Sequence, residues 1–429
     1  MKPKNIYIVD GIRTPFCKMG TSLSNLSAVD LGQTATSQLV ARAGIDPGIV
    51  EHVVFGCVGQ PADAANMARV IALRAGIPKH VPACTVHRNC ASGFEAITHA
   101  AQMMAAEQAD VVLVGGAESM SQIPLFYSQL AAQKFGRLLR SRSFLAKLQA
   151  MAAFRPADFK PRIGLQLGLT DPTCGLNMGE TAEVIARKYG ISREEQDAYS
   201  VRSHLRAVAA RERLAEEICP VYGSGRGNET VVEHDNGPRP HQTMEAQNKL
   251  RPVFDRREGT VTPGNASQIT DGAVALLMMT EEACQRHGCE PLGRLVGYCY
   301  AGCEPKEMGL GPVFAIDAAE KRYKISLDSA DLIEINEAFA AQVIGVLKTI
   351  KCEQFARKHL GRLRALGEIS DEKLNVNGGA IALGHPVGAS GARLALTALK
   401  ELRRRQGKRA LVTLCVGGGQ GGALWLERD

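Results

Sequence analysis

The amino-acid sequence predicts an α/β protein with two or three domains. Its 429 residues are more than one compact core holds. Short β-branched runs alternate with longer helical patterns, which is typical of α/β folds with buried sheets. The two ends of the chain also share one outline. An apolar fraction of 45% and a charged fraction of 22% fit an ordinary globular protein.

The predicted strands end in small or polar residues. They lie at 6–9, 52–58, 110–118, 331–338 and 410–419. Helical patterns occur between them, for example at 92–107 and 389–404. The first of these is apolar on most faces, which predicts a helix that is buried on all sides.

The order strand, Gly/Ser-rich elbow, buried helix occurs twice. It appears around Cys90, in VHRNCASGFEAITHA, and again over 377–402. In both halves a further strand follows and ends in Gly-Gly, as VVLVGGAE and VTLCVGGG. This similarity of outline favours an internally duplicated fold.

The region 121–265 differs in character from both halves. Within it, 131–163 carries eight Lys/Arg against one acid, Asp158, and its apolar residues fall near helical spacing. Such a basic amphipathic segment suits an anionic membrane surface or a partner, or else packs on the main body with a solvated basic face. The stretch 223–243 carries turn residues throughout and is predicted to be a loop.

Charge and cysteine usage narrow the function class. The net charge of +7 indicates an anionic ligand, and no basic motif with stacking aromatics accompanies it, so nucleic acid is not expected. Twelve cysteines without regular spacing indicate reduced thiols. The N-terminus runs directly into a strand pattern, and the longest apolar run, 273–279, is too short to span a bilayer. A cytoplasmic location is expected.

Cys90 stands directly ahead of the first buried helix. A helix start offers unpaired N–H groups and the positive end of the helix dipole, and both favour the nucleophilic thiolate. The alternative is a small buried hydrophobic residue, since free cysteine is often buried.

Three further segments carry chemistry at predicted strand ends or elbows. His385 lies in the elbow GHPVGASG, where it is either a base that activates a thiol or a satisfied structural group. Cys415 ends a strand and precedes glycines, and Asn336 follows the strand 332–335. This set suits thioester chemistry with Cys90 as nucleophile, Cys415 as proton carrier and His385 as activator. Backbone N–H groups near Gly417 and the Asn336 amide would stabilise oxyanions.

A metal site is not expected. The nearest cysteine pairs, Cys284/Cys289 and Cys299/Cys303, lack zinc-finger spacing and have only His287 close by.

Seven segments in chain order resemble the thiolase family over essentially the whole chain. They are NCASGFEA, VVLVGGAESMS, NMGETAE, GNASQITDGA, EINEAFA, NVNGGAIALGHPVGASGAR and LCVGGGQGGA. The resemblance implies a five-layered α-β-α-β-α fold with two duplicated halves and an inserted loop domain. The N-terminal half would be 1–120, completed by about 266–290, with the loop domain at 121–265 and the C-terminal half at 291–429.

The resemblance also implies thiolytic cleavage of 3-ketoacyl-CoA in fatty-acid β-oxidation, by a ping-pong route through an acyl-enzyme. Coenzyme A would be a substrate, with no permanently bound cofactor, and the protein would be a homodimer or homotetramer. The matching positions are Cys90 for the acylated nucleophile, His385 for its activator, Cys415 for the acid/base and Asn336 for an oxyanion-hole water. The N–H groups of Cys90 and Gly417 would form a second oxyanion hole. Ser267 resembles the serine that meets the pantetheine arm of CoA, and Met178 a residue that lines the acyl and pantetheine tunnel.

Two features depart from the compact members of the family. Asn177 stands where short-chain acetoacetyl-CoA thiolases often have histidine, and the stretch from Met120 to Met178 is about twenty residues longer. That length resembles the β-subunits of fatty-acid oxidation complexes, which implies a membrane surface or an α-subunit as the partner of 131–163. The same basic segment could steer the CoA phosphates.

The open alternatives are a short-chain acetyl-CoA acetyltransferase, a condensing enzyme of the ketoacyl-synthase type, and a catalytically weak partner-binding subunit. The second cysteine, Cys415, argues against the condensing enzyme. The complete set Cys90, Asn336, His385 and Cys415 argues against the inactive subunit.

Overall fold

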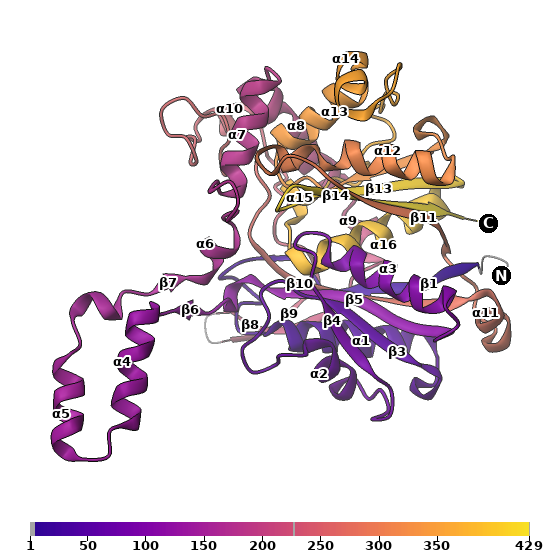
Figure 1. Ribbon diagram of the computed structural model, residues 1–429. Helices are drawn as coiled ribbons and strands as arrows, with labels where there is room; N and C mark the ends of the chain where they lie inside the picture. The colour runs from indigo at the N-terminus through magenta and orange to yellow at the C-terminus, as the bar shows by residue number, and fades with distance from the viewer. Residues whose placement is uncertain (1–4, 226–227, 429) are drawn as a thin grey trace.

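The structure, a computed structural model, describes residues 5–225 and 228–428. Its body has five layers: helices, a sheet, a central helix pair, a second sheet and further helices (Figure 1). None of the helices in the described ranges is long and apolar enough to cross a membrane.

The N-terminal sheet has the strand order β4-β3-β5-β10-β1. Its strands are β1 (Ile6–Arg13), β3 (His52–Gly56), β4 (Ala83–Val86), β5 (Val111–Ser119) and β10 (Thr270–Thr280), and the short β2 (Cys17–Lys18) pairs with β10. Strand β3 is parallel to β4 and β5, whereas β10 is antiparallel to both β5 and β1. Helices α1 (Ala28–Ala43) and α2 (Met67–Arg74) contact this sheet and cover its outer face in Figure 1.

The C-terminal sheet has the order β12-β13-β14-β11. Its strands are β11 (Gly293–Gly302), β12 (Leu332–Ile335), β13 (Arg409–Val416) and β14 (Gln420–Glu427), with α12 (Gly311–Tyr323) and α13 (Ala340–Ile350) on its outer side. Both sheets show one pattern, a parallel pair followed by two antiparallel pairings. The predicted duplication is therefore confirmed. Among the described residues, the two sheets join where β1 pairs with β11.

Helices α3 (Ser92–Ala105) and α16 (Val387–Arg405) form the central layer. The apolar residues predicted for the first of these, such as Phe94 and Ile97, are fully buried. The helices meet at glycines. A Cβ on Gly93 would lie 2.6 Å from the Ala392 nitrogen, and one on Gly391 2.5 Å from the Phe94 nitrogen. Small residues thus bring the first turns of the two helices to backbone distance.

The inserted region holds most of its structure in helices. Those in its second half are α7 (Met178–Lys188), α8 (Arg193–Ala209), α9 (Arg211–Ala215) and α10 (Met244–Asn248). The prediction of a loop at 223–243 is wrong in part, because β8 (Val221–Gly225) and β9 (Asn228–Val232) pair there as a hairpin. Residues 226 and 227 lie outside the described residues.

The remaining elements are short. They are α11 (Glu281–His287), α14 (Glu353–Phe355) and α15 (Ala380–Leu383), a π turn at Ala356–Leu360, and 3-10 turns at Pro47–Ile49, Met120–Gln122, Pro156–Phe159, Pro305–Leu310 and Leu327–Ser329.

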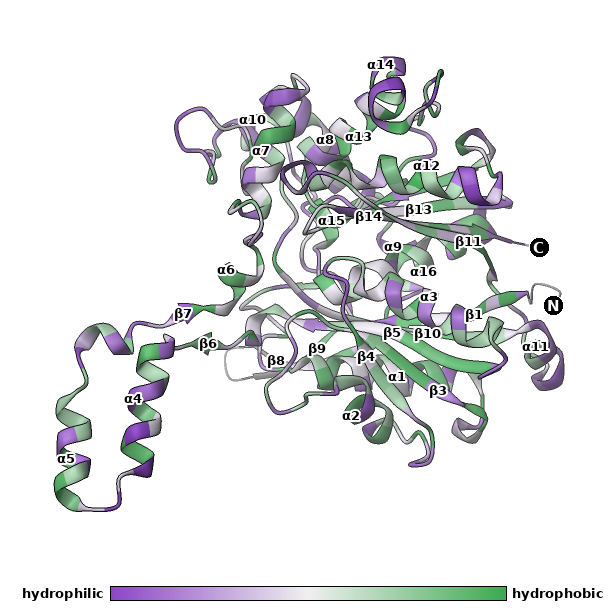
Figure 2. Ribbon diagram, viewed as in Figure 1, coloured by the Kyte–Doolittle hydropathy of each residue, from purple (hydrophilic) through white to green (hydrophobic). Residues whose placement is uncertain are grey.

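The basic segment forms a helical hairpin that projects away from the body (Figure 1). A two-stranded ribbon of β6 (Leu125–Phe126) and β7 (Arg162–Ile163) carries α4 (Gln129–Arg140) and α5 (Phe144–Ala152), and α6 (Gly164–Gly168) follows the ribbon. Figure 2 shows hydrophobic and hydrophilic residues intermixed on both helices. The alternative of a helix packed on the main body is therefore wrong.

Candidate active site

Cys90 is placed by a tight elbow between β4 and α3. Asn89 takes a left-handed conformation with φ +43°, which asparagine tolerates better than most residues. The Ser92 hydroxyl donates to the Asn89 carbonyl at 2.7 Å and accepts from the Arg88 N–H at 2.9 Å. These bonds fix the nucleophile candidate at the start of α3.

The electrostatics at Cys90 differ from the sequence prediction. Burial raises the pKa of this thiol, while the backbone N–H groups of Gly417 and of Cys90 itself act in the opposite direction. The prediction that the helix start ionises the thiol is therefore wrong for the free protein, because desolvation outweighs the N–H groups. Cys90 is a thiol at neutral pH and needs a base.

Gly417 opens a glycine loop between β13 and β14. A Cβ at this position would lie 3.3 Å from the Met178 sulfur and 3.6 Å from Nδ2 of Asn89. Met178 is the first residue of α7. Asn177 and Glu180 form a capping box at the start of this helix. The structure thus brings Met178, Gly417 and Cys90 together.

Cys415 lies near the end of β13 and is fully buried. Burial raises the pKa of its thiol well above the usual value, and the nearby Cys90 and Cys303 thiols add to the rise. Half-buried Cys90 and fully buried Cys415 are therefore neighbours, and each thiol holds its proton until another group removes it.

His385 lies in the elbow ahead of α16. Its backbone N–H faces the Gln268 carbonyl (3.2 Å) and the Thr270 hydroxyl (3.1 Å). Its Nδ1 is 2.6 Å from the Ser390 hydroxyl, and that hydroxyl donates to the Pro386 carbonyl at 3.0 Å. Since the one proton of Ser390 goes to that carbonyl, Nδ1 carries the ring proton and Nε2 is the unprotonated nitrogen.

The imidazole is neutral. Burial, and then the positive charge of Arg393, lower the pKa of His385 to about 4. A neutral ring with its Nε2 unprotonated is the form that takes a proton from a thiol.

Asn336 follows β12 directly. Its backbone N–H donates to the Thr413 carbonyl at 3.0 Å, and its Nδ2 lies 3.4 Å from Nε2 of His385. Its buried Oδ1 has no hydrogen-bond partner within 5–225 and 228–428. Thr413 is two residues before Cys415 on β13, so the amide lies at the carboxyl end of the parallel strands β12 and β13, where the second thiol also lies.

Two buried carboxylates, which the sequence analysis did not assign, support the site. Glu337 accepts from the Tyr199 and Ser203 hydroxyls, the Asn375 amide and the Ile381 N–H, at 2.6–3.2 Å. Glu118 accepts from the N–H groups of Val58, Gly59 and Gly388 at 2.8–3.1 Å. The first fixes the segment before His385, and the second fixes the start of α16. Their sequence signal is a charged residue at the end of an apolar strand.

Ser267 lies beside this group. Its N–H donates to the Ala338 carbonyl at 2.9 Å, and the next residue, Gln268, accepts from the His385 N–H. Among the described residues no cluster of three or more His, Cys, Asp or Glu could hold a metal ion.

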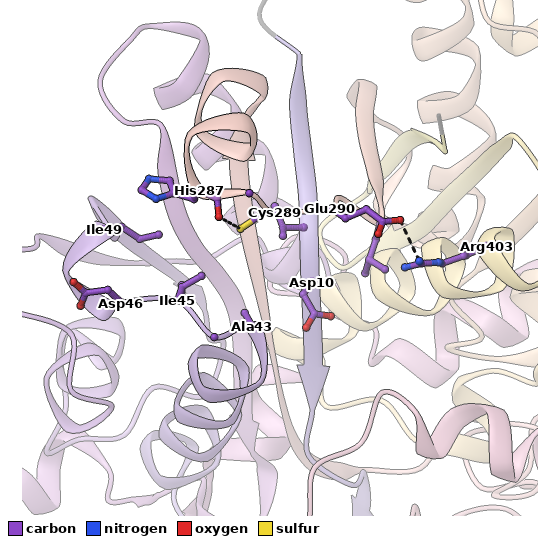
Figure 3. Close-up of a pocket in the computed structure, with 13 residues that line it drawn as sticks. Asp10, Ala43, Ile45, Asp46, Ile49, His287, Cys289, Glu290 and Arg403 are labelled. Carbon is purple, nitrogen blue, oxygen red and sulfur yellow. Dashed lines mark hydrogen bonds and ion pairs between the residues drawn. The ribbon is translucent and has the colours of Figure 1, made fainter.

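A separate cavity of about 520 Å³ lies at the other end of α16 (Figure 3). It is lined by residues that include Asp10, Asp46, His287 and Arg403, and the Arg403 guanidinium pairs with Glu290 at 3.2 Å. Arg403 is 16 residues beyond Val387 on this helix, roughly 24 Å at 1.5 Å per residue. This cavity is not part of the thiol site.

Comparisons with known proteins agree with the fold and the motifs. Residues 6–282 match the family model "Thiolase, N-terminal domain", and residues 289–428 match "Thiolase, C-terminal domain". The chain is 41% identical to a 3-ketoacyl-CoA thiolase of Pectobacterium atrosepticum over 98% of this chain and 96% of the relative, and 41% identical to one of Yersinia pestis with the same coverage.

Two solved structures superpose on nearly the whole chain. One is the Bacillus anthracis acetyl-CoA acetyltransferase, with a TM-score of 0.86, 37% identity, and coverage of 99% of this chain and 98% of that one. The other is the human mitochondrial 3-ketoacyl-CoA thiolase in complex with CoA, with a TM-score of 0.84, 38% identity and the same coverage.

Proposed function

The chain belongs to the thiolase family, and from that premise we propose that it cleaves 3-ketoacyl-CoA with CoA, giving acetyl-CoA and an acyl-CoA shortened by two carbons. The reaction serves fatty-acid β-oxidation. The observation that carries the proposal is the pair of neighbouring thiols, half-buried Cys90 and fully buried Cys415, together with the neutral imidazole of His385 next to the Asn336 amide.

In the first half-reaction, Nε2 of His385 takes the Cys90 proton and the sulfur attacks the 3-keto carbon. The sulfur–carbon bond forms, and the bond between C2 and C3 then breaks. Cys415 gives its proton to the C2 carbanion, which leaves as acetyl-CoA. Because burial raises the pKa of both thiols, neither step proceeds from a free thiolate; each needs the stated proton transfer.

In the second half-reaction, the Cys415 thiolate takes the proton of the incoming CoA thiol. The CoA sulfur attacks the acyl carbon, and Cys90 leaves and recovers its proton from His385. The N–H groups of Cys90 and Gly417 stabilise the oxyanion on the Cys90 acyl group, and Asn336 with His385 holds the water that stabilises the thioester enolate. Ser267 and Met178 contact the pantetheine arm and line the acyl tunnel.

A short-chain acetyl-CoA acetyltransferase would use the same residues. The 41% identity to enzymes named 3-ketoacyl-CoA thiolase favours the β-oxidation substrate, as does Asn177 in place of histidine. An inactive partner-binding subunit is disfavoured because all four reacting side chains are present.

The test is CoA-dependent cleavage of acetoacetyl-CoA and of a long-chain 3-ketoacyl-CoA, with wild type and Cys90→Ser. Cleavage of the long substrate that is lost in the variant is the expected result. Activity on acetoacetyl-CoA alone would favour the acetyltransferase. No activity on either substrate, with the protein folded, would contradict the proposal. Cys289→Ser is the matched control, since Cys289 lines the distant cavity.

The proposal also covers ligands, domains, location and oligomeric state. CoA is a substrate, no cofactor is permanently bound, and 121–265 acts as a loop domain between the halves 1–120 with 266–290 and 291–429. The location is cytoplasmic, which the free cysteines support. The protein is a homodimer or homotetramer, and the edge strand β4 supports this because within the described chain it pairs only with β3.

The hairpin contacts an anionic membrane surface. Its most exposed apolar side chains flank the tip, with Leu139 85% exposed and Phe144 79% exposed, and Arg137, Arg140 and Arg142 lie among them. Exposed apolar residues interleaved with cations suit the interface of an anionic bilayer. Its base has its own small core, in which the rings of Phe135 and Phe154 meet at a tilt with their centroids 4.8 Å apart and Lys134 pairs with Asp158 at 2.6 Å.

Flotation with phosphatidylglycerol vesicles tests this contact. The wild type is expected to float, and the triple variant Arg137→Gln, Arg140→Gln, Arg142→Gln to stay with the unbound protein. Neutral phosphatidylcholine vesicles serve as control. A wild type that does not float, but binds a β-oxidation α-subunit through the hairpin, would replace the membrane with a protein partner.

A further inference from the structure

The glycine loop 417–419 is held from two sides by hydrogen bonds to its carbonyls. Nδ2 of Asn89 donates to the Gly417 carbonyl at 2.8 Å, and the N–H of Cys303 donates to the Gly419 carbonyl at 2.7 Å. Gly418 and Gly419 have φ of +89° and +77°, which glycine adopts without strain. A loop of three glycines has little stiffness of its own, so these contacts set its shape.

Asp171, in the connection between α6 and α7, lies near the same loop. The residue is 3% exposed. Its Oδ1 accepts from the Thr173 hydroxyl at 2.5 Å and from the Thr173 N–H at 2.7 Å, while its buried Oδ2 has no hydrogen-bond partner among the described residues. The Thr173 hydroxyl, and with it backbone N–H groups that include that of Gly418, lower the pKa of Asp171. The carboxylate therefore faces the glycine loop in its charged form.

The Gly417 carbonyl and the Gly418 N–H are the two ends of one planar peptide. Asn89 holds the first end from the elbow that carries Cys90, and Asp171 faces the second from the inserted region. The Gly417 N–H, which faces the Cys90 sulfur, belongs to the preceding peptide, and that peptide follows Val416, which pairs with Gln420 on β14. Holding the peptide planes on both sides of Gly417 fixes its two backbone dihedral angles and, with them, the direction of its N–H.

We propose that Asn89 and Asp171 are positioning residues that clamp the peptide between Gly417 and Gly418, so that the Gly417 N–H points at the carbonyl oxygen during acyl transfer to Cys90. The clamp rests on the proposed function, since it acts only if Cys90 becomes acylated. Asn89 has two structural roles here. Its left-handed backbone shapes the elbow, and its side-chain amide donates to the Gly417 carbonyl in the loop.

The effect is expected in reactions that pass through an oxyanion. Removing one oxyanion-hole donor typically costs a factor of about 10²–10³ in rate, so a displaced donor is expected to cost about tenfold or more. Alkylation of the same sulfur by iodoacetamide forms no oxyanion. It reports access to the thiol and its ionisation only.

The experiment compares these two reactions at one pH. Acetyl transfer from acetyl-CoA to Cys90 is followed by the mass of the protein, and iodoacetamide alkylation in a parallel sample. Asn89→Gly keeps the left-handed backbone and removes the amide. Its acetylation is expected to slow at least tenfold, and its alkylation to change less than threefold. Asn89→Asp, which keeps the side-chain shape without the donor, gives a second variant should the first not fold. Asp171→Asn tests the other end of the peptide, and Asn248→Ala, exposed on α10, is the control.

Equal slowing of both reactions would overturn the clamp, because the change would then lie in the thiol and not at the oxyanion. Unchanged acetylation in both Asn89 variants would overturn it as well. A wild type that is alkylated at Cys90 but never acetylated would overturn the proposed function itself, and the clamp with it.

Discussion

The five-layered body and the hairpin at 125–163 use apolar side chains in opposite ways. In the body they are buried, and Trp425 and Phe94 are fully covered between layers. In the hairpin Leu139, Phe144 and Leu145 are 66–85% exposed. Both regions contain amphipathic helices, but only in the body does the apolar face meet a sheet. The body therefore supplies the chemistry and the stability, while the hairpin presents a surface.

The largest expected effect is on kcat, which should depend on the body and not on the hairpin. His385→Ala removes the proposed base for Cys90 and is expected to lower the kcat for thiolysis about a thousandfold. Deleting 128–161, with β6 joined to β7 by a short Gly-Ser link, is expected to leave kcat within about threefold, because the hairpin projects away from the layers that carry the site. Steady-state assays on both variants measure this. A deletion as damaging as the His385 change would break the comparison.

The next largest effect is on the free energy of unfolding, which should respond to changes in the body and not to changes in the hairpin. Glu337→Ala leaves the Tyr199 and Ser203 hydroxyls, the Asn375 amide and the Ile381 N–H without their buried acceptor. We expect a loss of about 3–5 kcal/mol in the free energy of unfolding, measured by denaturant titration. Phe144→Ser, at the exposed tip, is expected to leave the unfolding midpoint where it was.

A third effect concerns the pH dependence of the body. The folded pKa of His385 is lowered to about 4, whereas the unfolded chain takes up the proton near 6.5. As the pH falls from about 6.5 to 4 the unfolded state is protonated first, so the folded state loses on the order of 3 kcal/mol. The stability from this group is present above pH 6.5. His385→Gln is expected to flatten this part of the curve, and an unchanged slope would contradict it.

The same shift predicts how activity depends on pH. The acylation rate is expected to stay high below pH 6.5 and to fall only near pH 4, because His385 remains an unprotonated base over that range.

The smallest effect is expected from the hairpin arginines. The triple change of Arg137, Arg140 and Arg142 to glutamine should change the KM for CoA less than about twofold, since the hairpin lies away from the layers that hold Cys90. A large rise in KM would mean that the hairpin steers CoA phosphates, and would join the two regions in one function.

The features that the sequence predicted are local ones. Cys415 near a strand end, Asn336 directly after 332–335, and His385 in an elbow before a helix all follow from short patterns of apolar runs and glycines. The same patterns predicted the duplicated halves and the buried α3.

The features that it missed depend on distant contacts. The Asn89 amide meets a carbonyl 328 residues away, and no local pattern marks that contact. The raised pKa of the Cys90 thiol follows from burial by other segments, which a helix start does not reveal. An amphipathic pattern at 131–163 predicts a helix with an apolar and a basic face, but it does not show whether the apolar face packs on the body. A pattern rich in turn residues at 223–243 likewise hid the pairing of β8 with β9.

The position of β10 has a consequence for synthesis on the ribosome. This strand fills the place between β5 and β1 in the N-terminal sheet, yet it begins at Thr270, about 150 residues after β5 ends at Ser119. At 5–20 residues per second, the nascent chain carries the facing edges of β1 and β5 without their partner for roughly 10–30 s. During that interval the facing edges of two apolar strands have unpaired backbone N–H and C=O groups. In this state the nascent chain is most accessible to chaperones. It is also most prone to pair wrongly with other nascent chains on the same polysome.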